Sequence, residues 1–398
     1  MKKVFLLALI GVLVSSSSAQ SCLGDVWQSL QNHKIMEAKK KIDECMVGNE
    51  QSAKAWLYKG NVYLSVFNQD EERLKKNPEY VSKTPDAIWV AYESFYKALE
   101  INKDLAPEDG LISAREGQLL CGKPFYERGI AAKDAKDFPN AEKLLRAAIK
   151  CFNLDPGYKK YLGYLYNDLA SVTLELKGQE AYKEILEEAY KANTDRVQIY
   201  HLLYQIYSNE KDSVKCGALI KKAKKNVAPK DQTSIFVLEL SYWANIGDTT
   251  NLFKTVAEIE TKFDTIPAII TDAATYLIDA KQFEKATELA QKGLEKNPND
   301  FSLNSIMAYC FYKETNEIIK LGNAAVIAQD FKLANHYKTM KDSCLMKAHD
   351  WAEKAYQIQP RDFTNASMLR QLKLQLAKEV PAELNAIIEE TKPQQTQQ

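Results

Sequence analysis

The chain has 398 residues, and its 53 Lys and Arg are balanced by 53 Asp and Glu that are interspersed along the sequence. This balance argues against a nucleic-acid-binding protein, which needs a basic face. Gly and Pro are scarce, at 15 and 12 residues, and this scarcity favours helices over a loop-rich β protein.

The N-terminus has the layout of a secretory signal peptide. Two lysines precede the apolar segment 4–14, and small residues follow it up to Ala19. Because the apolar segment is too short to span a bilayer, we predict a cleaved signal over residues 1–19. The alternative is an outer-membrane lipoprotein anchored through Cys22, although the residues before this cysteine fit a lipoprotein signal poorly. No later segment is apolar enough for a membrane helix, so we predict an exported, periplasmic protein.

Small residues recur along the chain at fixed spacings of four, three and five. The sets are Ala286, Ala290, Gly293, Pro298 and then Ala348, Ala352, Ala355, Pro360. Residues four and three apart share one helix face, where small side chains let a neighbouring helix approach closely. The proline just past the last turn ends the helix. Upstream of such helices lies a second set of aromatic and small residues, for example Trp56, Gly60 and Tyr63.

Together the two sets resemble the tetratricopeptide repeat, in which W-x2-L-G-x2-Y precedes A-x3-F, A and P with a period of about 34 residues. The resemblance covers nearly the whole mature chain. It implies an all-α fold, a right-handed superhelical solenoid of about eight helical hairpins with a C-terminal capping helix. An exported protein of this size with a signal ending in Ala-Gln is similar to the tetratricopeptide proteins common in Bacteroidota.

The repeats place the hairpins in one solenoid domain, 20–390. They are predicted at 20–52, 53–105, 122–156, 157–196, 197–230, 233–266, 267–300 and 301–362. The second hairpin carries an insertion at 68–86, and the eighth has about 28 extra residues between the repeat positions of its two helices. Residues 363–390 are predicted to add the capping helix, and the polar end 391–398 is predicted to be disordered.

The sequence contains no complete catalytic or metal-binding motif. Residues 117–123 match most of a P-loop, but Pro124 follows the lysine where a Ser or Thr should bind Mg²⁺. The 4 histidines have no zinc-site spacing, and no nucleophile elbow occurs. We therefore expect no cofactor, no metal and no enzymatic activity. Asn61 occupies one position of a carboxylate clamp found in co-chaperone repeats, but Leu57 replaces its partner lysine, so Asn61 is predicted to be an ordinary surface residue.

The resemblance implies that the first helix of each hairpin lines a concave face. Residues there outside the packing positions are Tyr126, Tyr164, Asn167, His201, Gln205, Ser208, Asn209, Tyr309 and Tyr312. Such side chains combine apolar area with hydrogen bonds and suit peptide contact. The alternative is that some of the tyrosines pack between hairpins.

The sequence thus predicts a non-catalytic scaffold for protein–protein interaction in the bacterial cell envelope, with a protein or an extended peptide as partner. The alternative is a structural subunit of an envelope or secretion assembly that oligomerises through the eighth hairpin, 301–362.

The 7 cysteines belong to a chain predicted to enter a compartment that permits disulfides. In an antiparallel helical hairpin, residues equidistant from the turn lie opposite one another. The midpoints of Cys22 and Cys45, and of Cys121 and Cys151, both fall at predicted turns. We therefore predict the disulfides Cys22–Cys45 and Cys121–Cys151. The alternative is that every cysteine is a small packing residue.

Overall fold

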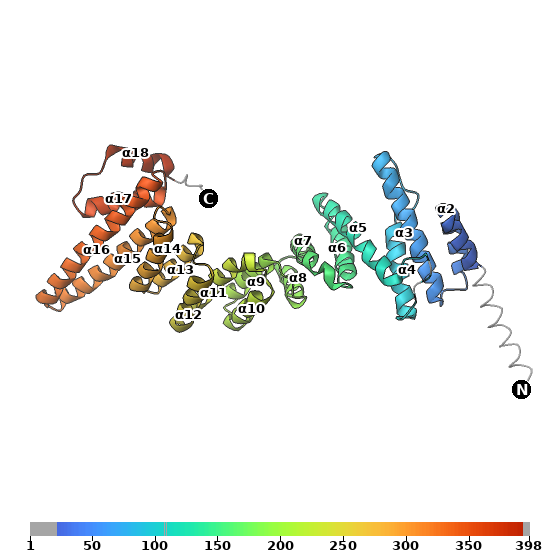
Figure 1. Ribbon diagram of the computed structural model, residues 1–398, viewed down its shortest axis with the longest axis horizontal. Coiled ribbons are helices and arrows are strands. Elements are labelled where there is room, and N and C mark those ends of the chain that lie inside the picture. Colours follow the sequence, from blue (N-terminus) through green and yellow to red (C-terminus); the bar gives the residue numbers. More distant parts are fainter. Residues whose placement is uncertain (1–21, 107, 109, 393–398) are drawn as a thin grey trace, which may run out of the picture. The chain divides into compact units, whose positions relative to one another are not determined.

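The computed structural model describes residues 22–106, 108 and 110–392, and all regular structure within them is helical (Figure 1). From residue 35 to 191, and again from 213 to 391, each α-helix packs against the next one along the chain, so the predicted all-α array of helical hairpins is confirmed. The chain divides into two compact units, Met1–Ile199 and Tyr200–Gln398. The predicted signal peptide, 1–19, lies outside the described residues.

Unit 1 contains hairpins of unequal length. Its elements are a helix at 22–31, α2 (Ile35–Met46), α3 (Ala53–Lys76), α4 (Ala87–Ile101), α5 (Ala114–Asp134), α6 (Phe138–Phe152), the 3-10 turn η1 (Pro156–Tyr158), α7 (Lys159–Lys177) and α8 (Gln179–Lys191). The insertion predicted at 68–86 lengthens α3 and adds a loop before α4. The third hairpin begins at Ala114 rather than at the predicted residue 122, because Pro124 is accommodated inside α5.

Unit 2 begins in the first turn of α9 and ends with the two longest helices and a cap. Its elements are α9 (Val197–Asn209), α10 (Ser213–Asn226), the 3-10 turn η2 (Pro229–Asp231), α11 (Gln232–Ile246), α12 (Thr249–Lys262), α13 (Pro267–Asp279), α14 (Phe283–Lys296), α15 (Phe301–Ile327), α16 (Phe331–Ile358), α17 (Phe363–Gln375) and α18 (Ala382–Thr391). The extra residues of the eighth hairpin therefore extend its two helices instead of forming a loop.

The cap consists of two helices where the sequence predicted one. Ala377 takes a left-handed φ of 51° after α17, and Pro381 precedes α18, so the chain turns between them. Thr391, predicted to begin the disordered tail, is the last residue of α18, and residues 393–398 of that tail lie outside the described part.

Most hairpin turns share one construction. A single residue adopts a left-handed φ between 55° and 61° at His33, Lys136, Lys211, Lys281 and Gln329. At three of these turns the next residue is an aspartate that caps the second helix. Asp137, for example, accepts a hydrogen bond from the Asn140 backbone N–H at 3.4 Å, and Asp212 and Asp330 do the same for Lys215 and Leu333. The cap satisfies a backbone donor that the helix start leaves free.

The small-residue positions of the repeats lie in the core, as the spacing predicts. On α4, Ala91, Phe95 and Ala98 are fully buried. The Phe95 ring fills the space between α3 and α5, because a Cβ added to Gly60 would meet the ring at 2.6 Å and one added to Gly117 would also clash with it. Gly117, the first glycine of the P-loop-like segment, is therefore a helix-packing residue.

Asn61 is buried, and the prediction that it is a surface residue was wrong. Its amide nitrogen donates to the Ile112 carbonyl at 2.9 Å, and its amide oxygen accepts from the Ile112 backbone N–H at 2.8 Å. This two-way pairing fixes the segment before α5 against α3. A buried amide that mimics a peptide group can satisfy a loop in this way.

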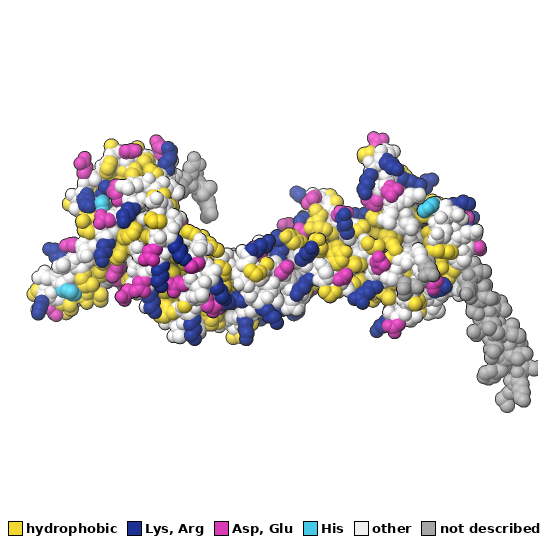
Figure 2. Space-filling model, in the orientation of Figure 1, with side chains coloured by type: hydrophobic (Ala, Val, Ile, Leu, Met, Phe, Trp, Pro, Cys, Tyr) yellow, Lys and Arg dark blue, Asp and Glu magenta, His cyan; other side chains and the backbone are white. Residues whose placement is uncertain are grey.

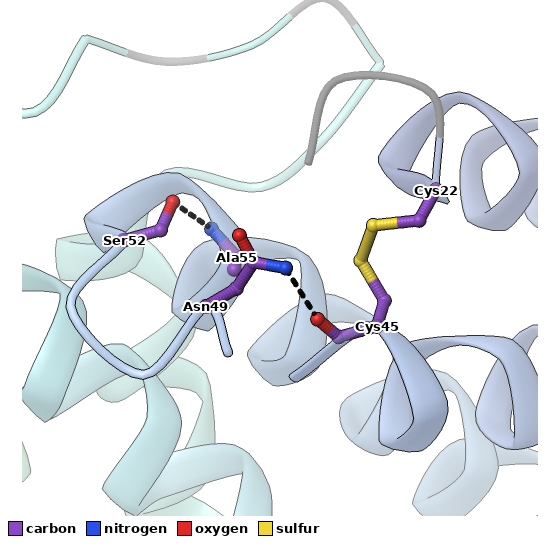
Figure 3. The surroundings of a disulfide bond; sticks show 5 residues. All are labelled: Cys22, Cys45, Asn49, Ser52 and Ala55. Carbon is purple, nitrogen blue, oxygen red and sulfur yellow. Dashed lines mark hydrogen bonds between the residues drawn. A yellow bond between two sulfur atoms is a disulfide. The ribbon is translucent and has the colours of Figure 1, made fainter. Parts of the chain in front are cut away.

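The disulfide Cys22–Cys45 closes the first hairpin, as predicted, with its Cα atoms 5.8 Å apart (Figure 3). The turn at His33 lies midway between the two cysteines. Figure 3 also shows how α2 is followed directly by α3: the Asn49 amide donates to the Cys45 carbonyl at 2.7 Å, and Ser52 caps α3 by accepting from the Ala55 N–H.

The second predicted disulfide is not formed, since Cys121 and Cys151 are both free and buried. The turn at Lys136 lies midway between them, so the register prediction was right. The two cysteine side chains, however, do not point towards each other. The Cys151 Cβ lies 3.0 Å from the place where a Cβ on Gly122 would be, so Cys151 faces the residue beside Cys121. Adjacent helix positions point about 100° apart.

Candidate protein-binding site

The first helices of unit 1 share a surface, which we call the first-helix face. Helix α3 contacts α5, and α5 contacts α7. Ion pairs bridge the helices in turn: Arg128 of α5 lies 3.0 Å from Glu71 of α3, and Lys133 of α5 lies 2.6 Å from Asp168 of α7. The first-helix face is thus a polar surface that is organised by contacts between hairpins.

Asp168 is the centre of this surface. Its carboxylate accepts a hydrogen bond from the Tyr126 hydroxyl at 3.2 Å in addition to the Lys133 ammonium. Tyr126 is half-buried, and burial, followed by the negative charge of Asp168, raises the pKa of its hydroxyl. The phenol therefore stays protonated and donates. We call Tyr126, Lys133, Tyr164, Asp168 and Arg196 the Asp168 cluster.

Tyr164 completes the cluster four residues before Asp168 on the same helix face. The Arg196 guanidinium lies over its ring at 4.1 Å, within cation–π range. A Cβ on Gly163 would meet the Arg196 stem at 2.6 Å, so the glycine makes room for this arginine. Tyr164 still exposes 51% of its surface. The predicted residues Tyr126 and Tyr164 are therefore brought together, and the half-exposed Asn167 lies between Tyr164 and Asp168 in sequence.

In unit 2 the predicted residues fall on two separate helices. His201, Gln205, Ser208 and Asn209 all lie on α9. Gln205 and Asn209, four apart, are exposed, whereas His201 and Ser208 are half-buried. Burial lowers the pKa of His201. Helix α9 thus presents a short polar strip.

Tyr309 and Tyr312, on α15, are half-buried and packed against hydrophobic core clusters. For these two tyrosines the packing alternative describes the structure better than exposure to a partner does.

An aromatic pocket lies in unit 1 away from the predicted residues. This cavity of about 800 Å³ is lined by Trp56, Tyr92, Glu93, Tyr96, Lys97, Gln118, Lys150, Asn153 and Leu154, from α3 to α6 and the residues that follow. On the face drawn in Figure 2, hydrophobic side chains gather on the surface of unit 1 near α5 and α6. Burial raises the pKa of Tyr92 to about 12.

The described residues hold no metal site, and the buried thiols of α5 and α6 are not activated as nucleophiles. They contain no group of three His, Cys, Asp or Glu side chains placed to hold a metal ion. Burial raises the pKa of Cys151 to about 12 and also raises that of Cys121, so these thiols stay protonated and react slowly. Residues 117–123 lie within α5, where the backbone N–H groups are committed to the helix. Within the described part of the chain, no helix combines the length and hydropathy needed to cross a bilayer.

Comparisons with known proteins return structural likeness only. No family model and no curated protein matches the sequence. A tetratricopeptide repeat protein from Parabacteroides merdae is similar at 13% identity over 64% of this chain and 98% of its own, with a TM-score of 0.35. Yeast Tom70 is similar at 13% identity over 94% of this chain and 92% of its own, with a TM-score of 0.39. YrrB, described as a tetratricopeptide protein with an unusual peptide-binding site, is similar at 16% identity over 54% of this chain and 97% of its own, with a TM-score of 0.31.

Sequence reasoning found the tyrosines of the Asp168 cluster but missed its charged residues. Asp168 lies four residues after Tyr164, so helical spacing places it beside that tyrosine. Lys133 lies seven residues after Tyr126, two turns along the same helix face. Arg196 follows α8 and carried no periodic signal. The aromatic pocket was missed because its residues come from four helices whose contacts no local pattern reports.

Proposed function

We propose that the chain is a non-catalytic scaffold of the bacterial cell envelope that binds a protein or an extended peptide on its first-helix face. The Asp168 cluster carries this proposal. Asp168 is held by two hydrogen bonds and Tyr164 by the Arg196 guanidinium, so a partner would order few side chains on binding. Aromatic and arginine side chains are also the residues that contribute most at protein interfaces.

Two exposed tyrosines on α7 provide a matched test. Tyr164 belongs to the cluster, whereas Tyr161, three residues earlier, packs against Phe152 and Tyr158. Crosslinked pull-down from the native envelope should capture about tenfold less partner with Tyr164→Ala, the size expected of an interface hot spot. Tyr161→Ala should capture as much as the wild type. Equal capture by both variants, or loss of helicity in Tyr164→Ala, would remove the proposal.

The polar strip on α9 allows a second, independent pull-down experiment. Gln205→Ala with Asn209→Ala removes two exposed side chains from unit 2 without touching the core. If the partner extends over both units, this double variant should lower capture while leaving the melting temperature unchanged. Unchanged capture would restrict the interface to unit 1.

The proposed location is the periplasm, after cleavage of residues 1–19. The disulfide Cys22–Cys45 supports export, because disulfides persist in oxidising compartments. It also competes with the lipoprotein alternative, since a lipid attached to Cys22 would occupy the same sulfur. Intact mass with and without reductant separates the two: a two-hydrogen gain on reduction supports the disulfide, and an added diacylglyceryl mass supports the lipoprotein.

A second candidate function, assembly through the eighth hairpin, rests on the tip where α15 meets α16. Ile327 and Phe331 expose 83% and 66% of their surface there, and Val326 is also exposed. Clustered apolar side chains at the surface often mark an interface. Light scattering of the purified chain tests this candidate: a stable oligomer that dissociates in Ile327→Ser with Phe331→Ser supports it, and a monomer rejects it.

A further inference from the structure

The aromatic pocket contains a glutamine whose side-chain amide opens to the cavity. Gln118 exposes only 4% of its surface, and its side chain lines the cavity. Within the described part of the chain its side-chain amide forms no hydrogen bond, and the amide atoms are open to the cavity instead of being enclosed in the core. A polar group that opens only to a cavity takes its hydrogen-bond partner from whatever occupies that cavity.

The chemistry of the missing partner follows from the amide. A glutamine side chain offers both an N–H donor and a carbonyl acceptor. A peptide group offers the complementary acceptor and donor, and the chain itself uses this pairing where Asn61 binds the backbone of Ile112 in both directions. A phosphate or carboxylate would use only the donor half. The amide therefore favours a peptide backbone.

The walls of the pocket select the side chain. Trp56 donates its indole N–H to the Glu50 carbonyl at 2.8 Å, so what it offers to the cavity is ring surface. Tyr92 and Tyr96 add two more rings, 6.5 Å apart. Aromatic rings pair with one another edge-on or offset, so the exposed parts of these rings can take a further ring, and the cavity volume of about 800 Å³ is that of a ligand site.

We propose that this pocket binds a peptide through an aromatic side chain, with Gln118 pairing to the peptide group beside it. The pocket is lined largely by the second helices α4 and α6 and does not include the Asp168 cluster, so the proposal does not depend on the first-helix face. The pocket would be a second binding site of the chain, one that recognises a single aromatic residue of a peptide.

The test uses N-acetyl-phenylalaninamide, which carries one ring and two peptide groups. The full mature chain, labelled with 5-fluorotryptophan, is titrated by ¹⁹F NMR, and the Trp56 signal among the 5 tryptophans is assigned with Trp56→Phe. We expect this signal to shift and saturate. N-acetyl-alaninamide and ethylbenzene, which lack the ring and the peptide groups respectively, should bind at least about tenfold more weakly.

Two variants locate the interaction. Gln118→Met keeps the side-chain length but removes the amide, and it should raise the Kd for N-acetyl-phenylalaninamide about tenfold, the loss expected when peptide groups find no partner. Tyr96→Ala, at a mostly exposed position that the fold does not need, should raise the Kd by a similar factor. Tyr164→Ala should leave the Kd unchanged, which separates this site from the first-helix face.

Several results would overturn the proposal. A wild-type chain whose Trp56 signal does not move, or an unchanged Kd in Tyr96→Ala, would show that the cavity does not take the ring. Equal affinity for ethylbenzene and N-acetyl-phenylalaninamide, or an unchanged Kd in a folded Gln118→Met, would reduce the pocket to a non-selective apolar surface. Loss of partner capture in Tyr164→Ala would bear on the proposed function alone.

Discussion

Phe95 and Ile327 lie in helices of the same repeat type but in opposite surroundings. Phe95 is 0% exposed and is enclosed by glycines of α3 and α5, one helix on either side of its own in sequence. Ile327 ends α15 at the tip of the eighth hairpin, with most of its surface in solvent. One region is a completed core, and the other is an apolar surface without a cover in the described structure.

The difference follows from helix length. The flanking helices α14 and α17 have 14 and 13 residues, whereas α15 and α16 have 27 and 28. Short neighbours can cover only part of the long pair, so towards the tip the two long helices contact mainly each other. A repeat buries its apolar face only where the next repeat reaches it. Extending one hairpin therefore creates exposed apolar surface without any change in the pattern of the helix.

The largest expected effect is in the completed core. Phe95→Ala removes a ring that touches two other helices, and it should lower the free energy of unfolding of unit 1 by about 3–5 kcal/mol. Chemical denaturation followed by circular dichroism measures this loss. Tyr96→Ala, at the adjacent exposed position, should change the same free energy by no more than about 0.5 kcal/mol. Similar losses in both variants would contradict the assignment of Phe95 to the core.

Loss of the disulfide Cys22–Cys45 should lower the free energy of unfolding somewhat less than Phe95→Ala does. Reduction of Cys22–Cys45 releases a loop of 23 residues and should cost about 3 kcal/mol in the chain-entropy account. Urea midpoints with and without dithiothreitol give the value. The double variant Cys22→Ala with Cys45→Ala is the control, because reductant should not shift its midpoint. A shift of equal size in that variant would assign the effect to another pair of cysteines.

A third prediction concerns the buried hydrogen bonds between Asn61 and the backbone of Ile112. Asn61→Ala leaves both backbone groups of Ile112 without their partner, and it should destabilise unit 1 by about 2 kcal/mol, the cost of unsatisfied buried polar groups. Hydrogen exchange gives a local readout, since the Ile112 amide should exchange faster than in the wild type. Asn167→Ala, at a half-exposed position on α7, should leave that rate unchanged. Protection of Ile112 in Asn61→Ala would show that another group holds the loop.

The sequence pattern predicted correctly those features that depend on helix periodicity and on the position of a turn. The spacing of Ala91, Phe95 and Ala98 predicted a buried helix face, and the position of the turn at His33 predicted the disulfide Cys22–Cys45. Both depend on helical periodicity and on chain reversal. The same logic placed Cys121 and Cys151 at equal distances from their turn but could not give the directions of the side chains.

Other features needed contacts between distant parts of the chain. Asn61 looked like a surface residue because its partner, Ile112, lies 51 positions away in sequence. In the candidate site, helical spacing identified Tyr126 and Tyr164, but the order in which hairpins stack decides that Arg196 covers Tyr164. The same stacking makes Gln118 the buried polar group of the pocket, and no pattern within α5 indicates this.

The smallest effect on stability should come from the tip of the eighth hairpin, and this makes it the sharpest test of the comparison. Ile327→Ser with Phe331→Ser removes two side chains that are mostly exposed, so the free energy of unfolding of unit 2 should change by no more than about 0.5 kcal/mol. Denaturation of the dilute chain, where any assembly has dissociated, measures this change. Leu345→Ser, a buried position of α16 packed against the cap, is the matched change and should destabilise unit 2 by about 2 kcal/mol or more, because it adds an unpaired hydroxyl to a lost apolar contact. If the tip variant is as unstable as Leu345→Ser, the tip is covered within the chain and the contrast with Phe95 disappears. If its stability is unchanged while its tendency to self-associate falls, the apolar tip serves contact with another molecule instead of the fold.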